Sequence, residues 1–215
     1  MQPIEAYNLV ATSEALSSRL DRGQNATIEL WGEEYGKKWL LKTTRPGENP
    51  ELIKNEIEVI RELQDTGVVP ELHEDYLDDS WGEAESYAML MINNAASLGD
   101  YAEAAVAGII PMNVLGDILK VAAASLEEFH QSGYIHNDLH ANNLVITLAP
   151  KGQWKVYVID FGWSYKEGEL PDWMDYERSW VAEDNIDDIT YLAEDLEGRS
   201  DDEEYLGIIS KWLRY

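Results

Sequence analysis

The sequence predicts an α+β protein with two lobes, a β-rich first part and an α-rich second part that meet near residue 93. Two segments of β-branched and aromatic residues flank a glycine-bounded polar loop near the start of the chain. A long amphipathic stripe typical of a helix follows the midpoint, and 215 residues are enough for one hydrophobic core. We therefore expect a single domain over residues 1–215, with one lobe over about 1–92 and the other over about 93–215.

The first expected elements are a short helix and a hairpin. Residues 1–20 have the pattern of the helix, with Leu9 among its anchors. The segments 27–31 and 38–43 favour strands, and the polar turn at 32–36 between them contains glycines. We expect these two strands to pair antiparallel.

A strongly marked helix follows over residues 49–67. Asn49 suits the N-cap, Pro50 suits the first helical position, and Gly67 provides a stop. Apolar residues recur at helical spacing and predict the buried face: Ile53, Ile57, Ile60 and Leu63. A buried strand is expected next, at 87–92.

The second part is dominated by helices. The stripe over residues 114–129 predicts a long helix that ends at Gly133. Segments 144–147 and 155–159 predict a second hairpin around a Pro-Lys-Gly turn, and a further helix is expected over 187–196.

Composition excludes several classes of function. With 42 Asp plus Glu against 16 Lys plus Arg, the formal net charge is -26, and such a surface repels phosphate backbones and anionic lipids. The absence of Cys excludes disulfides and thiolate zinc sites. No apolar run is long enough for a membrane span, and charged residues interrupt the place of a signal peptide. We therefore expect a cytoplasmic protein with neither a nucleic-acid nor a membrane partner.

Two short segments carry most of the functional information. The first runs from His136 to Asn143 directly after the long helix, and the second is Asp-Phe-Gly at 160–162, at the end of a strand. Both fall on short connections, where a rigid scaffold commonly holds catalytic groups. Each segment is weak evidence alone, because the tripeptide is most often a turn and a single histidine most often packs in a core.

Together these segments resemble the protein kinase-like superfamily, whose catalytic loop reads His-x-Asp-x-x-x-x-Asn and whose metal loop reads Asp-Phe-Gly. Asp138 and Asn143 have the required spacing, and Asp160 begins the second motif. The resemblance implies a two-lobed kinase-like fold, ATP and magnesium as cofactors, and phosphoryl transfer to a hydroxyl group. It also implies that Asp138 acts on the acceptor, while Asn143 and Asp160 hold magnesium.

The resemblance further requires a strand lysine and a helix acid upstream. Lys42 fits the lysine that clamps the nucleotide phosphates, and Glu56 fits the acid that orients it. Burial supports Glu56 independently, because it lies next to Ile57 on the face expected to be buried, where an ionised carboxylate needs a cation.

The expected nucleotide-binding segments depart from the usual glycine-rich pattern. The loop over the phosphates is closer to the Gly-x-x-Ala form of small kinases linked to transfer-RNA modification, and it comprises Gly23, Gln24, Asn25 and Ala26. The hinge that would hold the adenine includes Met91 and Ile92.

The acceptor has rival interpretations. His140 follows the catalytic aspartate where protein Ser/Thr kinases usually carry Lys, and Asp-Leu-His is typical of aminoglycoside and choline kinases. Only 53 residues follow Gly162 in the chain of 215, which leaves little chain to enclose a small acceptor. The favoured hypothesis is a minimal Ser/Thr protein kinase with a protein acceptor, which the acidity suggests is basic. The alternatives are a small-molecule kinase for an aminoglycoside, choline or a sugar, and a pseudokinase binding module.

The chain also resembles compact viral and bacterial-effector kinases. If it is one of these, its alternative location is the interior of a host cell into which it is delivered. At the start of the helix 187–196, Asp187 or Asp188 would hold the backbone of the catalytic loop. Asn137 stands where regulated kinases carry an arginine that awaits a loop phosphate, so we expect no requirement for loop phosphorylation.

Overall fold

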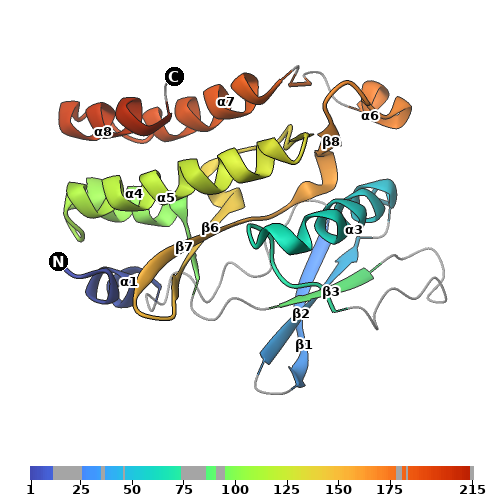
Figure 1. Ribbon diagram of the computed structural model, residues 1–215, viewed down its shortest axis with the longest axis horizontal. Helices are drawn as coiled ribbons and strands as arrows, with labels where there is room; N and C mark the ends of the chain where they lie inside the picture. Colours follow the sequence, from blue (N-terminus) through green and yellow to red (C-terminus); the bar gives the residue numbers. More distant parts are fainter. Residues whose placement is uncertain are drawn as a thin grey trace.

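The computed structural model describes residues 1–11, 26–34, 37–45, 47–73, 86–90, 95–177, 181–182 and 184–213. Over these residues the chain is an α+β protein, as the sequence predicted. Its first half contains a three-stranded sheet and one long helix, and its second half is built around helices (Figure 1).

The sheet of the first half is antiparallel throughout, in the order β1-β2-β3. Its strands are β1 (Ala26–Glu34), β2 (Lys37–Thr44) and β3 (Ser86–Leu90). The predicted hairpin is therefore confirmed, and β2 is its central strand. Side chains in the middle of β2 are consequently flanked by a strand on each side.

Helix α3 (Glu51–Leu63) follows β2 and continues into the 3-10 turn η1 (Gln64–Thr66). The Oδ1 of Asn49 accepts a hydrogen bond from the Glu51 amide at 2.9 Å, which satisfies one of the amides exposed at a helix start. Gly67 ends the turn at a φ of 72°, a conformation that glycine adopts without steric cost. Gly67 therefore stops this segment as predicted, whereas the start differs by one residue: Pro50 occupies the N-cap and Glu51 is the first helical residue.

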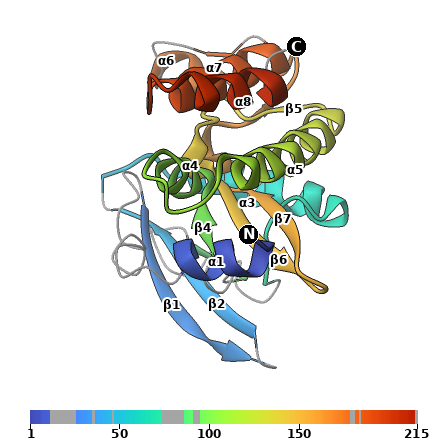
Figure 2. The ribbon, with the colours of Figure 1, turned by 90° about the vertical axis from the view of Figure 1, so that its left-hand side faces the viewer.

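The second half stacks two helical layers over a β-hairpin. Helices α7 and α8 form the outer layer, α4 and α5 lie beneath them, and β6 and β7 lie below these (Figures 1 and 2). The longer elements are α4 (Leu98–Val106), α5 (Met112–Gln131), β6 (Leu144–Ala149), β7 (Gln153–Val158), α6 (Asp172–Glu177), α7 (Asn185–Glu197) and α8 (Glu203–Leu213). The shorter ones are β4 (Ala96–Ser97), β5 (Tyr134–Ile135), η3 (Ala141–Asn143), η4 (Phe161–Trp163) and β8 (Tyr165–Lys166).

One hydrophobic core runs through both halves and reaches the functional segments. The ring of Phe161, which follows Asp160, stacks on Phe129 of α5 with ring centroids 5.7 Å apart. Both rings are fully buried. The metal loop predicted from the sequence is therefore anchored in the core by its central aromatic residue.

The first helix differs from its prediction. Helix α1 (Pro3–Ala11) buries Ala6 and Val10, which are four residues apart and share one face. Leu9 lies beside that face and is 49% exposed, so its assignment as an anchor was wrong. The helix packs against α4 and β6 (Figure 2), so it contacts elements of the second half.

Helices α4 and α8 were not predicted. The alanines of α4 make only a weak hydrophobic stripe, although Ser97 and Asp100 form a capping box at its start. The acidic run before α8 contains its start signal, because the Oδ1 of Asp202 accepts a hydrogen bond from the Tyr205 amide. Among the described residues, no helix is long and apolar enough to cross a membrane.

Candidate active site

Lys42 joins two carboxylates that come from distant parts of the chain. Its Nζ lies 2.6 Å from Oε2 of Glu56 on α3 and 2.8 Å from Oδ1 of Asp160. Glu56 is 2% exposed and Lys42 is 8% exposed, whereas the side chain of Asp160 is 49% exposed. The ion pair predicted from burial is therefore present, and Asp160 is the member that faces solvent.

The charges of this cluster reinforce one another. Burial by itself would lower the pKa of Lys42, but the adjacent carboxylates of Asp160 and Glu56 outweigh it and raise that pKa. The Lys42 ammonium in turn holds the pKa of Asp160 below its usual range. Lysine and aspartate are thus both charged at neutral pH, as a phosphate clamp and a metal ligand require.

The backbone of the metal loop is held by a residue that the sequence analysis missed. Asp160 has a φ of 68°, a left-handed conformation that is costly for a residue other than glycine. Asn55 of α3 donates from Nδ2 to the carbonyls of Phe161, Gly162 and Ser164, at 3.1, 3.0 and 2.6 Å. These contacts join the loop to α3. The only sequence signal was a polar residue directly before Glu56.

The catalytic loop is held by a buried aspartate of α7. The two carboxylate oxygens of Asp188 accept hydrogen bonds from the amides of His136 at 2.5 Å and Asn137 at 2.8 Å. Asp188, not Asp187, therefore makes the predicted contact with the loop backbone. The Nε2 of His130 on α5 lies 3.2 Å from the same carboxylate.

Asn137 connects the catalytic loop with the segment that follows the metal loop. It is fully buried and has a φ of 61°. Its Nδ2 donates to the carbonyl of Trp163 at 3.2 Å and contacts Sδ of Met174 at 3.3 Å. Its Oδ1 accepts from the amide of Ala182 at 2.8 Å. One neutral side chain thus holds three chain segments together.

Asp138 and Asn143 are fixed relative to one another. The Nδ2 of Asn143 donates to the carbonyl of Asp138 at 2.9 Å, and the carbonyl of Asn143 accepts from the Ile159 amide at 3.0 Å. The first contact sets the geometry within the catalytic loop, and the second ties this loop to the residue before Asp160. The two predicted motifs therefore form one connected unit.

The oxygen donors of this unit suit a hard divalent cation. A carboxylate at Asp160 and an amide oxygen at Asn143 are ligand types that magnesium prefers. Among the described residues, no group of three or more Asp, Glu, His or Cys side chains could hold a metal.

Most residues of the expected nucleotide pocket lie outside the described part of the chain. These are Gly23, Gln24, Asn25, Met91 and Ile92. Ala26 is the first residue of β1. Its place agrees with a loop that leads into the first strand, and its role stays a prediction.

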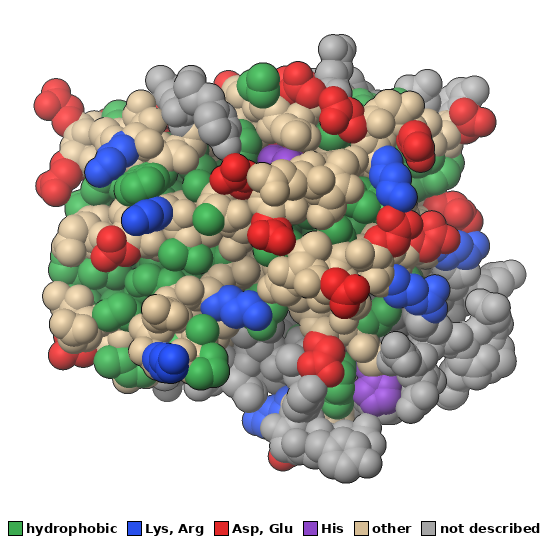
Figure 3. Space-filling view, in the orientation of Figure 1, with side chains coloured by type: hydrophobic (Ala, Val, Ile, Leu, Met, Phe, Trp, Pro, Cys, Tyr) green, Lys and Arg blue, Asp and Glu red, His purple; other side chains and the backbone are tan. Residues whose placement is uncertain are grey.

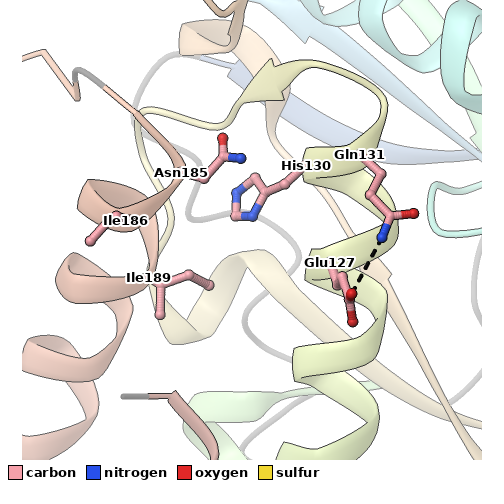
Figure 4. Close-up of a pocket in the computed structure, with 6 residues that line it drawn as sticks. All are labelled: Glu127, His130, Gln131, Asn185, Ile186 and Ile189. Carbon is pink, nitrogen blue, oxygen red and sulfur yellow. Dashed lines mark hydrogen bonds between the residues drawn. The ribbon is translucent and has the colours of Figure 1, made fainter. Parts of the chain in front are cut away.

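A separate pocket of about 400 Å³ lies between the end of α5 and the start of α7 (Figure 4). Its lining residues are Glu127, His130, Gln131, Asn185, Ile186 and Ile189. It shares no lining residue with the cluster around Lys42. Its nearest link to the catalytic loop is the contact between His130 and Asp188.

The model of the lipopolysaccharide kinase (Kdo/WaaP) family matches residues 40–169, which is more than half of the chain and contains both motifs and the Lys42–Glu56 pair. The chain belongs to this family. A solved structure described as WaaP in complex with acyl carrier protein has a similar fold, with a TM-score of 0.56 and 13% identity. The match covers 89% of this chain and 76% of that one.

Family membership confirms the kinase-like fold and a phosphotransferase with a hydroxyl acceptor, and it implies ATP and a divalent metal. It does not support the favoured hypothesis of a Ser/Thr protein kinase with a protein acceptor. The small-molecule alternative agrees better with a lipopolysaccharide kinase family. The 53 residues after Gly162 do not decide between the acceptors, because the length of a segment does not define which acceptor it contacts.

His136 is expected to make this kinase less stable in mild acid. It is fully buried, its Nε2 lies 2.9 Å from the carbonyl of Ile159, and burial lowers its pKa from the ordinary 6.5. Below 6.5 the unfolded chain therefore binds a proton that the folded chain excludes. The free energy of unfolding should therefore decrease as the pH is lowered below 6.5, by up to about 1.4 kcal/mol per pH unit, until the lowered pKa of the folded state is reached.

Urea unfolding between about pH 5 and pH 8 measures this effect. His136→Phe keeps an aromatic ring in contact with both Phe129 and Phe161 but has no titrating group. Its free energy of unfolding should depend less steeply on pH than that of the unchanged kinase. Equal slopes for the two proteins would contradict the assignment.

Proposed function

We propose that this kinase transfers the γ-phosphoryl group of ATP, with magnesium, to a hydroxyl of a lipopolysaccharide sugar. The observation that carries the proposal is the contact of one buried lysine with both Glu56 and Asp160, in a chain of the Kdo/WaaP family. A charged lysine held between a helix carboxylate and a metal-loop carboxylate is the arrangement that phosphoryl transfer uses.

Each polar group has a role that follows from its position. Lys42 binds the α and β phosphates, and Glu56 keeps the Lys42 ammonium oriented and charged. Asp160 and Asn143 would hold magnesium, which would supply positive charge to offset that of the phosphates. Asp138 orients the acceptor hydroxyl and takes its proton as the oxygen attacks.

The anchored loops supply the positioning that this chemistry needs. In-line phosphoryl transfer depends on fixed charge and geometry, because the protein forms no covalent bond to the substrate. Asp188 and Asn143 fix the backbone on both sides of Asp138, and Asn55 fixes the backbone after Asp160. The general base, the proposed metal ligands and the phosphate clamp are therefore held by contacts within the protein itself.

The charge of the protein bears on how an acceptor approaches. The net charge is -26, and Figure 3 shows acidic side chains spread over one face with lysines and arginines between them. The negative electrostatic potential of such a surface slows the approach of an anionic acceptor at low ionic strength. An anionic lipopolysaccharide should accordingly be phosphorylated faster as salt screens the repulsion, whereas a neutral sugar should show little dependence.

The acceptor is identified by a panel assay with labelled ATP and magnesium. The panel contains lipopolysaccharide, the core oligosaccharide released from it, an aminoglycoside, choline and a mixed protein lysate. We expect label in lipopolysaccharide and in its oligosaccharide, and at least about 10²-fold less label with Asp138→Asn. Label confined to protein would overturn the proposed acceptor and restore the protein kinase hypothesis. Label confined to the aminoglycoside or choline would also overturn it.

A further inference from the structure

Helix α7 contacts the catalytic loop at a second point, beyond Asp188. Asp195 lies seven residues after Asp188, which is about two helical turns, so the two side chains lie on the same face of the helix. The Oδ2 of Asp195 accepts a hydrogen bond from the amide of Ala141 at 2.9 Å. One helix thus holds both the beginning and the end of the loop around Asp138.

The amide that Asp195 binds has a fixed place in the loop. Ala141 is fully buried and begins the 3-10 turn η3, which contains Asn143. A buried amide requires a partner, and the first amides of a helical turn have none within the turn. The Nδ1 of His140 accepts from the next amide, that of Asn142, at 3.2 Å. The start of η3 is therefore fixed by two side chains.

The carboxylate of Asp195 is itself held in place by Arg199, one turn later on the same stretch of chain. The Nη2 of Arg199 lies 3.4 and 3.3 Å from the two oxygens of Asp195. Its Nη1 lies 3.1 Å from Oε1 of Glu103 on α4. The carboxylate of Asp195 is therefore linked through Arg199 to α4, in addition to its own place on α7.

We propose that Asp195 is a positioning residue for phosphoryl transfer. By fixing the Ala141 amide it sets the distance between Asp138, which acts on the acceptor hydroxyl, and Asn143, which holds the metal. The inference rests on the proposed roles of these two residues. In this role Asp195 acts through the backbone of the catalytic loop, by its contact with the Ala141 amide, and not as a catalytic residue.

Three variants test the proposal. Asp195→Ala removes the acceptor of the Ala141 amide, whereas Asp195→Asn keeps an oxygen at that place and should restore much of the function. Glu194→Ala is the matched control, because it removes an exposed carboxylate from the neighbouring position of the same helix. We expect kcat to fall about 10- to 100-fold in Asp195→Ala, because small misplacements of catalytic groups have effects of this size. The Kd for ATP with magnesium should rise much less than kcat falls, because Lys42 and Asp160 are untouched and Asn143 alone of the proposed metal ligands is displaced.

Amide hydrogen exchange without nucleotide gives a readout that does not depend on activity. In Asp195→Ala the Ala141 amide should exchange faster, while the His136 and Asn137 amides, which Asp188 binds, should keep their protection. In Asp195→Asn the Ala141 amide should exchange at an intermediate rate. This isosteric variant keeps the test usable if the alanine variant folds poorly.

Two outcomes would overturn the positioning role. One is a kcat in Asp195→Ala that matches Glu194→Ala. The other is an equal loss of protection at all three amides, which would show general loosening of the fold. A failure of the proposed function is distinguishable, because the unchanged kinase would then put no label into lipopolysaccharide, while the faster exchange of the Ala141 amide in Asp195→Ala would remain.

Discussion

Asp160→Asn should reduce phosphoryl transfer by about 10³-fold or more, because it removes the only carboxylate among the proposed metal ligands. It also takes a negative charge from Lys42, which then contacts a single carboxylate, that of Glu56. Affinity for ATP in the presence of magnesium should fall together with turnover. Calorimetric titration with ATP and a transfer assay measure the two effects separately.

Asp138→Asn should behave differently from the metal-loop variant. Transfer should fall by about 10²- to 10⁴-fold, the usual contribution of a positioned general base, while ATP affinity stays close to that of the unchanged protein. Asp117→Asn, at an exposed position on α5, is the control for loss of an acidic side chain. If Asp138→Asn lost ATP affinity as completely as it lost transfer, the division of roles between the two aspartates would be wrong.

Lys42→Met should abolish transfer and also destabilise the fold, by about 3–5 kcal/mol. The reason is that Lys42 neutralises two carboxylates, and Glu56 is only 2% exposed. An uncompensated buried carboxylate is costly. Adding Glu56→Gln to Lys42→Met should recover part of the lost stability, with a coupling energy of about 0.5–3 kcal/mol.

At acid pH, the free energies of unfolding of Lys42→Met and of the unchanged protein should differ less than at neutral pH. Lys42 lowers the pKa of Asp160 below the ordinary 3.8, so their contact contributes stability above 3.8 that is lost as pH falls through the lowered value. Urea unfolding at a series of pH values measures the difference. Lys38→Met, at an exposed position on the same strand, is the control. Strictly additive losses in the Lys42 and Glu56 variants would count against the ion pair.

Much of the fold and of the candidate site could be predicted from local patterns. The helix at 49–67 has its start and stop signals within one segment, so its place needed no tertiary information. Glu56 was identifiable because an acid on an apolar face is anomalous, and this anomaly itself predicts a cation. A charged residue within an apolar helical stripe therefore carries functional information.

The missed features depend on contacts between distant residues. Asn55 binds carbonyls that lie more than 100 positions later in the chain. Every residue has a backbone carbonyl, so the partners of such a hydrogen bond cannot be identified by residue type. The strands β5 and β8 have two residues each and exist only because they pair with one another. Asp195 lacked a signal for the same reason, since its partner is a main-chain amide. Side chains that bind backbone are thus the hardest part of such a site to predict.

The side-chain amide of Asn137 bears on how the segment after the metal loop is held in place. An arginine at this position would carry a charge that must be balanced from outside the chain, whereas Asn137 is satisfied by Trp163 and Ala182 of its own chain. Hydrogen bonds between neutral groups change little with ionic strength, and none of these groups titrates near neutral pH. We therefore expect the segment after the metal loop to keep its place over a wide range of salt concentration and pH, and without phosphorylation. We expect the rate of the reaction to follow the supply of substrate instead.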